Sequence, residues 1–531
     1  MSSSFPQNSP EQILPSLWRF TSGLKGMHQP CHGYILKMQD AFLLIDPPGD
    51  LTPRVVESIS ADALVTHIFV THLQEEHVAS AKHYPQAIIH VPAGDEYLCQ
   101  GIESYERLIT PWPEPWEWES RGNFQGHLGG AKNERPAAQA LPLGESLRAG
   151  DRMMDMEVVS TPGHGKHAVT LIAVVDGRKV AFCGDLICEE GKLWNWFDCD
   201  WDYGPETGQR TLAASCRRLR DFPVDLLCPA HGEVLRDPRK ALKCLEENIL
   251  RVVARPEEPS PQAINFPESD SAAEGWRPVT PHIFQRKAGN NVIVVSSTGN
   301  ALVIDDGLCI WEPLEKRVAL HDAIFKQLKA ALGIRKIEWI IPTHYHGDHT
   351  ELIPHLAKNE GARIICLESI SGPMEHPERY NLACPLPWYG TVSETIPIDQ
   401  RVPEGFVLDW HEYQFRFFHL GGQTWFHLGL EAVVDGLRTL FVGDAFWGTA
   451  KTAQPVLCWN DAEPVAKGWI FALKRMIECK PDLLVCGHGS SLRDPLPYLQ
   501  TSLKAWETRL NDYARLNARS TWKEFFSPFQ D

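Results

Sequence analysis

The chain has 531 residues, 43% of them hydrophobic, and its 51 Lys plus Arg against 68 Asp plus Glu give a formal net charge of −17. The apolar content excludes disorder of the whole chain, and the acidity argues against a general affinity for nucleic acid or anionic membranes. No apolar run approaches the ~20 residues of a membrane span, the first residues lack a secretory pattern, and 14 scattered cysteines without a CxxC pair favour a reduced, cytoplasmic protein.

The same landmarks recur in the same order in the two halves of the chain. Each half opens with two β-rich runs that end in Ile-Asp, continues to a Gly-Asp after an apolar run, and reaches a His-Gly pair. The offsets are nearly constant: 259 residues from Asp46 to Asp305, 259 from Asp185 to Asp444, and 257 from His231 to His488. We therefore predict a divergent tandem duplication.

The composition changes between the two halves. Residues 256–275 are rich in Pro, Glu and Ser with little apolar periodicity, which is typical of a linker. The predicted domains are thus residues 1–255 and 276–531. In both, short β-branched or aromatic runs alternate with segments of helical periodicity, and one such helix should end at Gly333 before the apolar run IEWII. This order predicts an α/β fold, an αββα sandwich in each half.

A crowded group of metal-binding side chains follows the run IEWII in the second half. His344 and His346 are two residues apart, so in an extended segment their side chains share one face. Gly347 relaxes the backbone, and Asp348 and His349 then begin a helix. Zinc takes imidazole nitrogen and carboxylate oxygen, so these four side chains predict a metal site at a strand end. The first half has a related stretch, FVTHLQEEHVAS.

These motifs resemble those of the metallo-β-lactamase-fold superfamily, most closely its glyoxalase II-like hydrolases. The resemblance covers nearly the whole chain as two copies and implies that each copy binds one or two metal ions. In the second half it implies ligands at two positions bridged by one aspartate: His344, His346 and Gln423 at the first, Asp348, His349 and His488 at the second, with Asp444 between them. Gln423 stands where the family usually has histidine, which weakens the first position for zinc.

His419 and His427 flank Gln423 at a distance of four residues on either side. His427 matches a second histidine that often follows this motif in the family. Each is interpreted either as a core histidine with satisfied hydrogen bonds or as a residue that orients the metal ligands.

The resemblance also implies a candidate metal site in the first half, with substitutions in its first motif. Its residues are His72, Gln74, Glu76, His77, His164, Asp185 and His231. Gln74 replaces a histidine and Glu76 replaces an aspartate. One metal could be held by His72, His164 and Asp185 or by His77, Asp185 and His231. The alternative is a degenerate domain that is kept for packing or for shaping the site of the other half.

The implied activity is that of a zinc-dependent metallohydrolase with its main site in the second half. Metal-bound hydroxide would attack an ester, thioester, lactone, amide or phosphoester, with Asp348 as the catalytic residue that orients it. We expect zinc, with iron as a second choice, no other cofactor, a small-molecule substrate, and no nucleic-acid or membrane partner. The doubling suggests a pseudo-dimer of the two halves. Two alternatives remain: a mononuclear iron redox enzyme, and a non-catalytic metal- or ligand-binding pseudoenzyme.

Overall fold

The computed structural model describes most of the chain, and its contacts divide it into two compact units. The first unit comprises mainly Met1–Ile109 and Gly122–Ala254, and the second mainly Arg255–Leu510. The described residues are 9–22, 31–38, 41–99, 141–193, 199, 207–253, 275–286, 290–308, 314–377, 393, 395–448, 453–454, 468–489 and 491–516. Apart from Gly275, the predicted linker 256–275 lies outside them, so the domain boundaries given above stay predictions.

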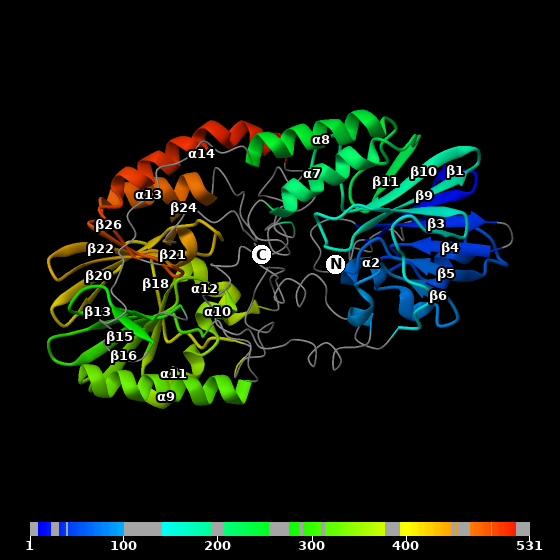
Figure 1. Cartoon of the computed structure of the whole chain (residues 1–531). Coiled ribbons are helices and arrows are strands. Elements are labelled where there is room, and N and C mark those ends of the chain that lie inside the picture. Colours follow the sequence, from blue (N-terminus) through cyan, green and yellow to red (C-terminus); the bar gives the residue numbers. More distant parts are fainter. Residues whose placement is uncertain are drawn as a thin grey trace, which may run out of the picture. The chain divides into compact units, whose positions relative to one another are not determined.

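The first unit contains two mixed sheets (Figure 1). The six-stranded sheet has the order β1-β2-β3-β4-β5-β6, antiparallel up to β4 and parallel from there. Its strands are β1 (Glu11–Leu14), β2 (Leu17–Ser22), β3 (Cys31–Met38), β4 (Ala41–Ile45), β5 (Val65–Phe69) and β6 (Ile88–His90). The five-stranded sheet has the order β11-β10-β9-β8-β7, with only the β10–β11 pair parallel. Its strands are β7 (Arg152–Met153), β8 (Met156–Ser160), β9 (Val169–Val175), β10 (Arg178–Gly184) and β11 (Leu226–Pro229).

The second unit repeats this plan. Its seven-stranded sheet runs β12-β13-β14-β15-β16-β17-β18, antiparallel up to β15 and parallel beyond it. The strands are β12 (Trp276–Pro278), β13 (Ile283–Arg286), β14 (Val292–Val295), β15 (Asn300–Ile304), β16 (Lys336–Ile341), β17 (Arg363–Leu367) and β18 (Gln400–Val402). Its six-stranded sheet runs β19-β20-β21-β22-β25-β26. These strands are β19 (Val407–Trp410), β20 (Tyr413–His419), β21 (Leu428–Val434), β22 (Leu437–Phe441), β25 (Leu483–Val485) and β26 (Leu492–Arg493), beside a small pair, β23 (Trp447–Gly448) and β24 (Ala453–Gln454).

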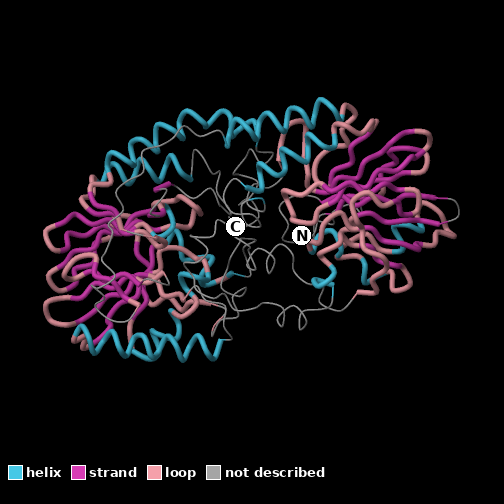
Figure 2. Tube along the Cα trace, in the orientation of Figure 1, coloured by secondary structure: helices cyan, strands magenta, loops and turns pink. Residues whose placement is uncertain are grey.

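Helices lie outside the sheets of each unit, and the strands gather between them (Figure 2). The helices of the first unit are α1 (Pro53–Glu57), α2 (Glu75–Val78), α7 (Thr207–Leu219) and α8 (Pro238–Val253), with the 3₁₀ turns η1 (Ala81–His83) and η2 (Glu96–Cys99). Those of the second begin with α9 (Leu314–Leu332), α10 (Gly347–Thr350), α11 (Ile353–Glu360) and α12 (Glu368–Glu375). They continue with η5 (Gly443–Ala445), α13 (Phe471–Cys479) and the greater part of α14 (Leu496–Leu516), whose residues from Asn511 onward are assigned to the first unit. Helix α9 ends just before Gly333, which has a left-handed φ of 64°, as the sequence predicts.

Apolar side chains fill the space between the two sheets of each unit. In the first unit, Tyr34 and Phe69 of one sheet belong to the same buried cluster as Leu171 and Phe182 of the other. In the second unit one cluster likewise joins β13–β17 to β19–β22. The strands β4 and β17 carry apolar runs because parallel strands are covered on both faces. The predicted α/β fold, a sandwich of two sheets between helices, is confirmed for both halves.

The duplication is also visible in matching turns. An Asp-Gly pair with positive φ at both residues joins β9 to β10 at Asp176 and β21 to β22 at Asp435. Each aspartate accepts a hydrogen bond from a backbone N–H, that of Ser16 at 2.8 Å and that of His282 at 3.0 Å. These hairpin turns tolerate few other residue pairs, so both copies kept them. Among the described residues, no helix has the length and apolar character to span a membrane.

Candidate metal centres

The predicted ligands of the second unit come together at one end of its two sheets. His344 and His346 lie in the loop after β16, and their ring centres are 4.4 Å apart, so they share one side of the chain as predicted. Asp348 and His349 lie in α10, as predicted. Asp444 follows β22 and His488 follows β25, which are parallel neighbours. Parallel strands end at the same sheet edge, which brings these residues to the β16 loop.

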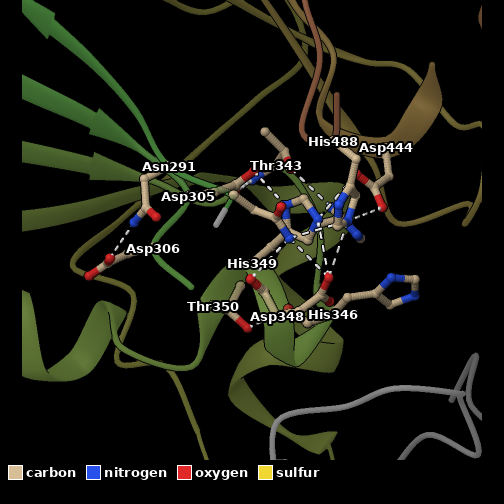
Figure 3. A network of polar contacts seen from close by, with 12 residues as sticks. Asn291, Asp305, Asp306, Thr343, His346, Asp348, His349, Thr350, Asp444 and His488 are labelled. Carbon is tan, nitrogen blue, oxygen red and sulfur yellow. Dashed lines mark hydrogen bonds and ion pairs between the residues drawn. The ribbon is translucent and has the colours of Figure 1, made fainter. Parts of the chain in front are cut away.

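Two carboxylates and two imidazoles form the tightest part of this cluster (Figure 3). The Nε2 atom of His349 is 3.1 Å from Asp444 Oδ1 and 3.7 Å from Asp348 Oδ2. The Nε2 atom of His488 is 3.3 Å from both Asp348 Oδ2 and Asp444 Oδ2. Four ligand atoms of one tetrahedral zinc ion, bound at 2.0–2.3 Å, lie roughly 3.3–3.8 Å apart. The second position of the site therefore has the residues and spacing that such an ion requires.

The first position is formed by His344, His346 and Asp444, whose ligand atoms lie within 4.8 Å of one another. The Nε2 atom of His344 is buried and has no hydrogen-bond partner among the described residues. The Oε1 atom of Gln423 is also buried and lacks such a partner. Buried polar atoms are seldom left unsatisfied, so these two atoms fit a metal ligand set, with the Gln423 carbonyl in the place of an imidazole.

Hydrogen bonds around the cluster decide which ring nitrogen faces inward. Thr343 donates both its N–H and its hydroxyl to Asp305, at 2.6 and 2.7 Å. The Thr343 oxygen then accepts the Nδ1–H of His344 at 3.0 Å, and Asp305 Oδ2 accepts the Nδ1–H of His349 at 2.9 Å. The Nε2 atoms of both histidines thereby face the cluster, as metal ligands need.

His427 and His419 lie outside the ligand cluster. His427 donates from Nδ1 to the Leu428 carbonyl at 3.1 Å, and its Nε2 accepts the backbone N–H of Asp444 at 3.1 Å. With both nitrogens used, His427 supports the Asp444 loop. His419 packs against Trp425, with ring centres 4.2 Å apart, and its Nδ1 lies 3.3 Å from the Ser369 hydroxyl.

The charges of the cluster shift the pKa values of its members in opposite directions. Burial disfavours a charged His349, but Asp444, Asp348 and Asp305 outweigh burial and raise its pKa well above the usual value. Burial also disfavours a charged His488, but Asp444 and Asp348 outweigh burial and raise the pKa of His488 to about 9. Burial acts against ionised Asp444, yet His488 and His349 hold its pKa well below the usual range. A divalent cation can replace the two imidazole protons because it neutralises the same carboxylates.

The first unit brings its counterparts together around Asp185. The Nε2 atoms of His77 and His231 lie 3.5 Å from Asp185 Oδ1 and Oδ2 respectively, and that of His164 lies 3.4 Å from Oδ2. His72, His164 and Asp185 form a group whose ligand atoms lie within 4.8 Å of one another. Here burial, followed by the neighbouring histidines, lowers the pKa of His72 and His77 well below the usual value. These imidazoles are therefore neutral.

Of the two substituted residues of the first motif, Gln74 and Glu76, the structure describes the side chain of Gln74 only. The Nε2 atom of Gln74 lies 3.0 Å from His164 Nε2, so the amide occupies a nitrogen that could otherwise bind a metal ion. The side chain of Glu76 lies outside the described residues. The predicted first-unit residues other than Glu76 thus share one buried site.

Two polar neighbours of the second-unit ligands are absent from the ligand motifs. Asp305 is a landmark of the repeat, and its place directly after a buried strand is the sequence signal for a role at the site. Asn290 donates from Nδ2 to Asp348 Oδ2 at 2.9 Å and lies 3.3 Å from His488 Nε2. No motif marks Asn290, because it reaches the site from the connection just before β14, which is distant in sequence from both ligands.

Comparison with known proteins gives a family match over both halves. The sequence matches the family described as Metallo-beta-lactamase superfamily over residues 34–231 and 286–488. No curated protein matches the chain.

Three of the similar solved structures are named as metallo-β-lactamases or as members of their superfamily. A metallo-β-lactamase with a HARLDQ motif from Cronobacter sakazakii is 16% identical, with 45% of this chain and 96% of that chain covered and a TM-score of 0.35. A subclass B3 metallo-β-lactamase of Bradyrhizobium japonicum is 16% identical, with 46% and 98% covered and a TM-score of 0.33. An archaeal metallo-β-lactamase superfamily protein from Sulfolobus tokodaii is 18% identical, with 43% and 91% covered and a TM-score of 0.30.

Proposed function

Because the chain belongs to the metallo-beta-lactamase superfamily, we propose that it is a zinc-dependent hydrolase with its main site in the second unit. The observation that carries this proposal is the convergence of two carboxylates and four imidazoles at one sheet edge, with the Nε2 atom of His344 buried and unsatisfied. The metal ligands would be His344, His346, Asp348, His349, Gln423, Asp444 and His488. Zinc bound there would act as a Lewis acid and lower the pKa of a water molecule to about 7.

The exposure of the ligands indicates the side from which a substrate enters. The side chains of Asp348 and His488 are 20% and 13% exposed, whereas those of His349 and Asp444 are at most 2% exposed. The Asp348 carboxylate can therefore reach an attacking water molecule and accept its proton. Asn290 donates to Asp348 Oδ2 and fixes the direction of this carboxylate. We assign Asp348 as the catalytic base and Asn290 as its positioning residue.

The bond cleaved is proposed only as a class: an ester, thioester, lactone, amide or phosphoester of a small molecule. The net charge of −17 supports a small molecule over nucleic acid or an anionic membrane as the partner. The cytoplasm is the proposed location.

A matched pair of variants tests the reaction and its location. His344 and His72 occupy the same place in the two units, each with Nδ1 next to a threonine hydroxyl, at 3.0 and 3.2 Å. In a panel of ester, thioester, lactone and phosphodiester substrates, His344→Ala and Asp348→Asn should abolish turnover of any substrate that the wild type hydrolyses. His72→Ala should retain turnover.

Full activity in both His344→Ala and Asp348→Asn would refute the proposal. Metal analysis of the purified wild-type protein separates the alternatives. Iron in place of zinc would favour a redox enzyme, and a folded protein that binds neither metal would favour a non-catalytic binding protein.

A further inference from the structure

We propose that the first unit holds a metal ion through a thiolate, with Cys31, His77 and His231 as ligands and Asp185 as the fourth. Cys31 is outside every motif considered above. The inference adds a thiolate ligand to one of the two metal positions that the resemblance implies for this unit, and it does not depend on the reaction proposed for the second unit.

The three residues come from three separate elements and meet in the interior. Cys31 is the first residue of β3, His77 lies in α2, and His231 follows β11. Their ligand atoms all lie within 4.8 Å of one another. The exposed fractions are 1% for Cys31, 0% for His77 and 3% for His231.

Asp185 contacts both histidines of this group at the spacing of a shared ion. Its two carboxylate oxygens lie 3.5 Å from His77 Nε2 and His231 Nε2. Ligand atoms of one tetrahedral zinc ion lie roughly 3.3–3.8 Å apart. A thiolate, two neutral imidazoles and a carboxylate are a complete ligand set for zinc.

His77 provides an independent sign that a ligand is expected here. Neither of its ring nitrogens has a hydrogen-bond partner among the described residues, although the ring is fully buried. In the second unit Asp305 holds Nδ1 of the matching His349 at 2.9 Å. The equivalent Asp46 accepts the matching bonds from Thr71, but His77 Nδ1 has no hydrogen-bond partner among the described residues. A buried imidazole without hydrogen bonds is costly, and coordination of a metal removes that cost.

At the neighbouring metal position of this unit, one histidine is already engaged by the protein. The Gln74 amide lies 3.0 Å from His164 Nε2 and satisfies this nitrogen without a metal. The ion proposed here therefore lies on the other side of the cluster, where Cys31 lies.

The site is also wider than its counterpart, which suits sulfur. A β-carbon added at Gly487 of the second unit would lie 2.5 Å from Asp444 Oδ1 and 2.7 Å from His349 Cε1. The first unit has Ala230, which carries such a methyl group, at the matching place. The His–Asp distance is 3.5 Å there, against 3.1 Å in the second unit. Zinc–sulfur bonds of about 2.3 Å are longer than zinc–nitrogen bonds of about 2.0–2.1 Å.

Co²⁺ bound to the full-length protein provides a direct test, because only thiolate ligation produces a sulfur-to-cobalt charge-transfer band. The thiol of Cys31 loses its proton when it binds. We expect the band in the wild type, its complete loss in Cys31→Ala, and an unchanged band in Cys216→Ala. Cys216 is an equally buried cysteine in α7 and serves as the matched control. Cys486→Ala, which removes the thiol two residues before His488, should also keep the band.

A band that persists in Cys31→Ala, or that is lost in Cys486→Ala instead, would overturn the proposal. If Cys31→Ala does not fold, zinc X-ray absorption of the Cys486→Ala protein decides the question. A sulfur neighbour at about 2.3 Å supports the site, and a shell of nitrogen and oxygen alone overturns it. A Cys31-dependent band without hydrolysis would refute only the proposed function, whereas hydrolysis without any band would refute only the thiolate site.

Discussion

The contact between Asp305 and His349 allows a quantitative prediction, because the chain contains its own control. Asp305 Oδ2 accepts the Nδ1–H of His349 at 2.9 Å. Loss of such a carboxylate behind a ligating histidine typically weakens metal binding 10–100-fold, or about 1.4–2.7 kcal/mol. Asp305→Asn should therefore weaken zinc binding in the second unit by this factor, because an amide cannot stabilise the imidazole as a carboxylate does.

Asp46→Asn in the first unit is the matched control. Asp46 accepts hydrogen bonds from Thr71 N–H and Oγ1, both at 2.7 Å, and Asp305 accepts those of Thr343 at 2.6 and 2.7 Å. Both variants should lose a similar amount of folding stability through these bonds, about 1 kcal/mol. Only Asp305 has a hydrogen bond to a histidine, so only its variant should lose zinc affinity in the second unit.

Competition with a chromophoric chelator measures the affinity, and the binding phase that disappears in His346→Ala identifies the second unit. Thermal unfolding of both variants measures the shared loss of stability. An equal weakening of this phase in Asp46→Asn and Asp305→Asn would refute the reasoning, since it would trace the effect to the threonine bonds. An unchanged affinity in Asp305→Asn would refute it as well.

Three further predictions concern the second unit. Although burial opposes it, the carboxylates raise the pKa of His488 to about 9, so zinc must displace a proton below that pH. The zinc association constant should rise at least about tenfold per unit between pH 7 and 9, and a flat profile in a pH series of titrations would contradict this. Gln423→His should increase zinc bound at the first position because imidazole is the stronger ligand. Equilibrium dialysis would show the increase, and an unchanged stoichiometry and affinity would argue against Gln423 as a ligand. Gly487→Ala should lower zinc affinity, because the added β-carbon would lie 2.5 Å from Asp444 Oδ1. Circular dichroism of this variant should show an intact fold. An unchanged zinc affinity would contradict the geometry.

The sequence by itself determined the duplication, the fold class and most of the second-unit ligands. Apolar runs bounded by turns predict strands because burial of a strand requires a local pattern. The four side chains from His344 to His349 could be grouped because they lie within six residues, where backbone geometry alone limits their separation. Landmarks at a nearly constant offset were enough to pair Asp444 with Asp185 across the two halves.

Only the tertiary structure decided how the two sites differ. Asp46 and Asp305 are the same landmark in the sequence, yet only Asp305 bonds a histidine. Gln74 and His164 are 90 residues apart and meet at 3.0 Å, and Cys31 reaches His231 from another sheet. Such contacts depend on where strand ends converge and on which way each side chain turns. Local patterns do not encode either, because both follow from packing of the whole unit.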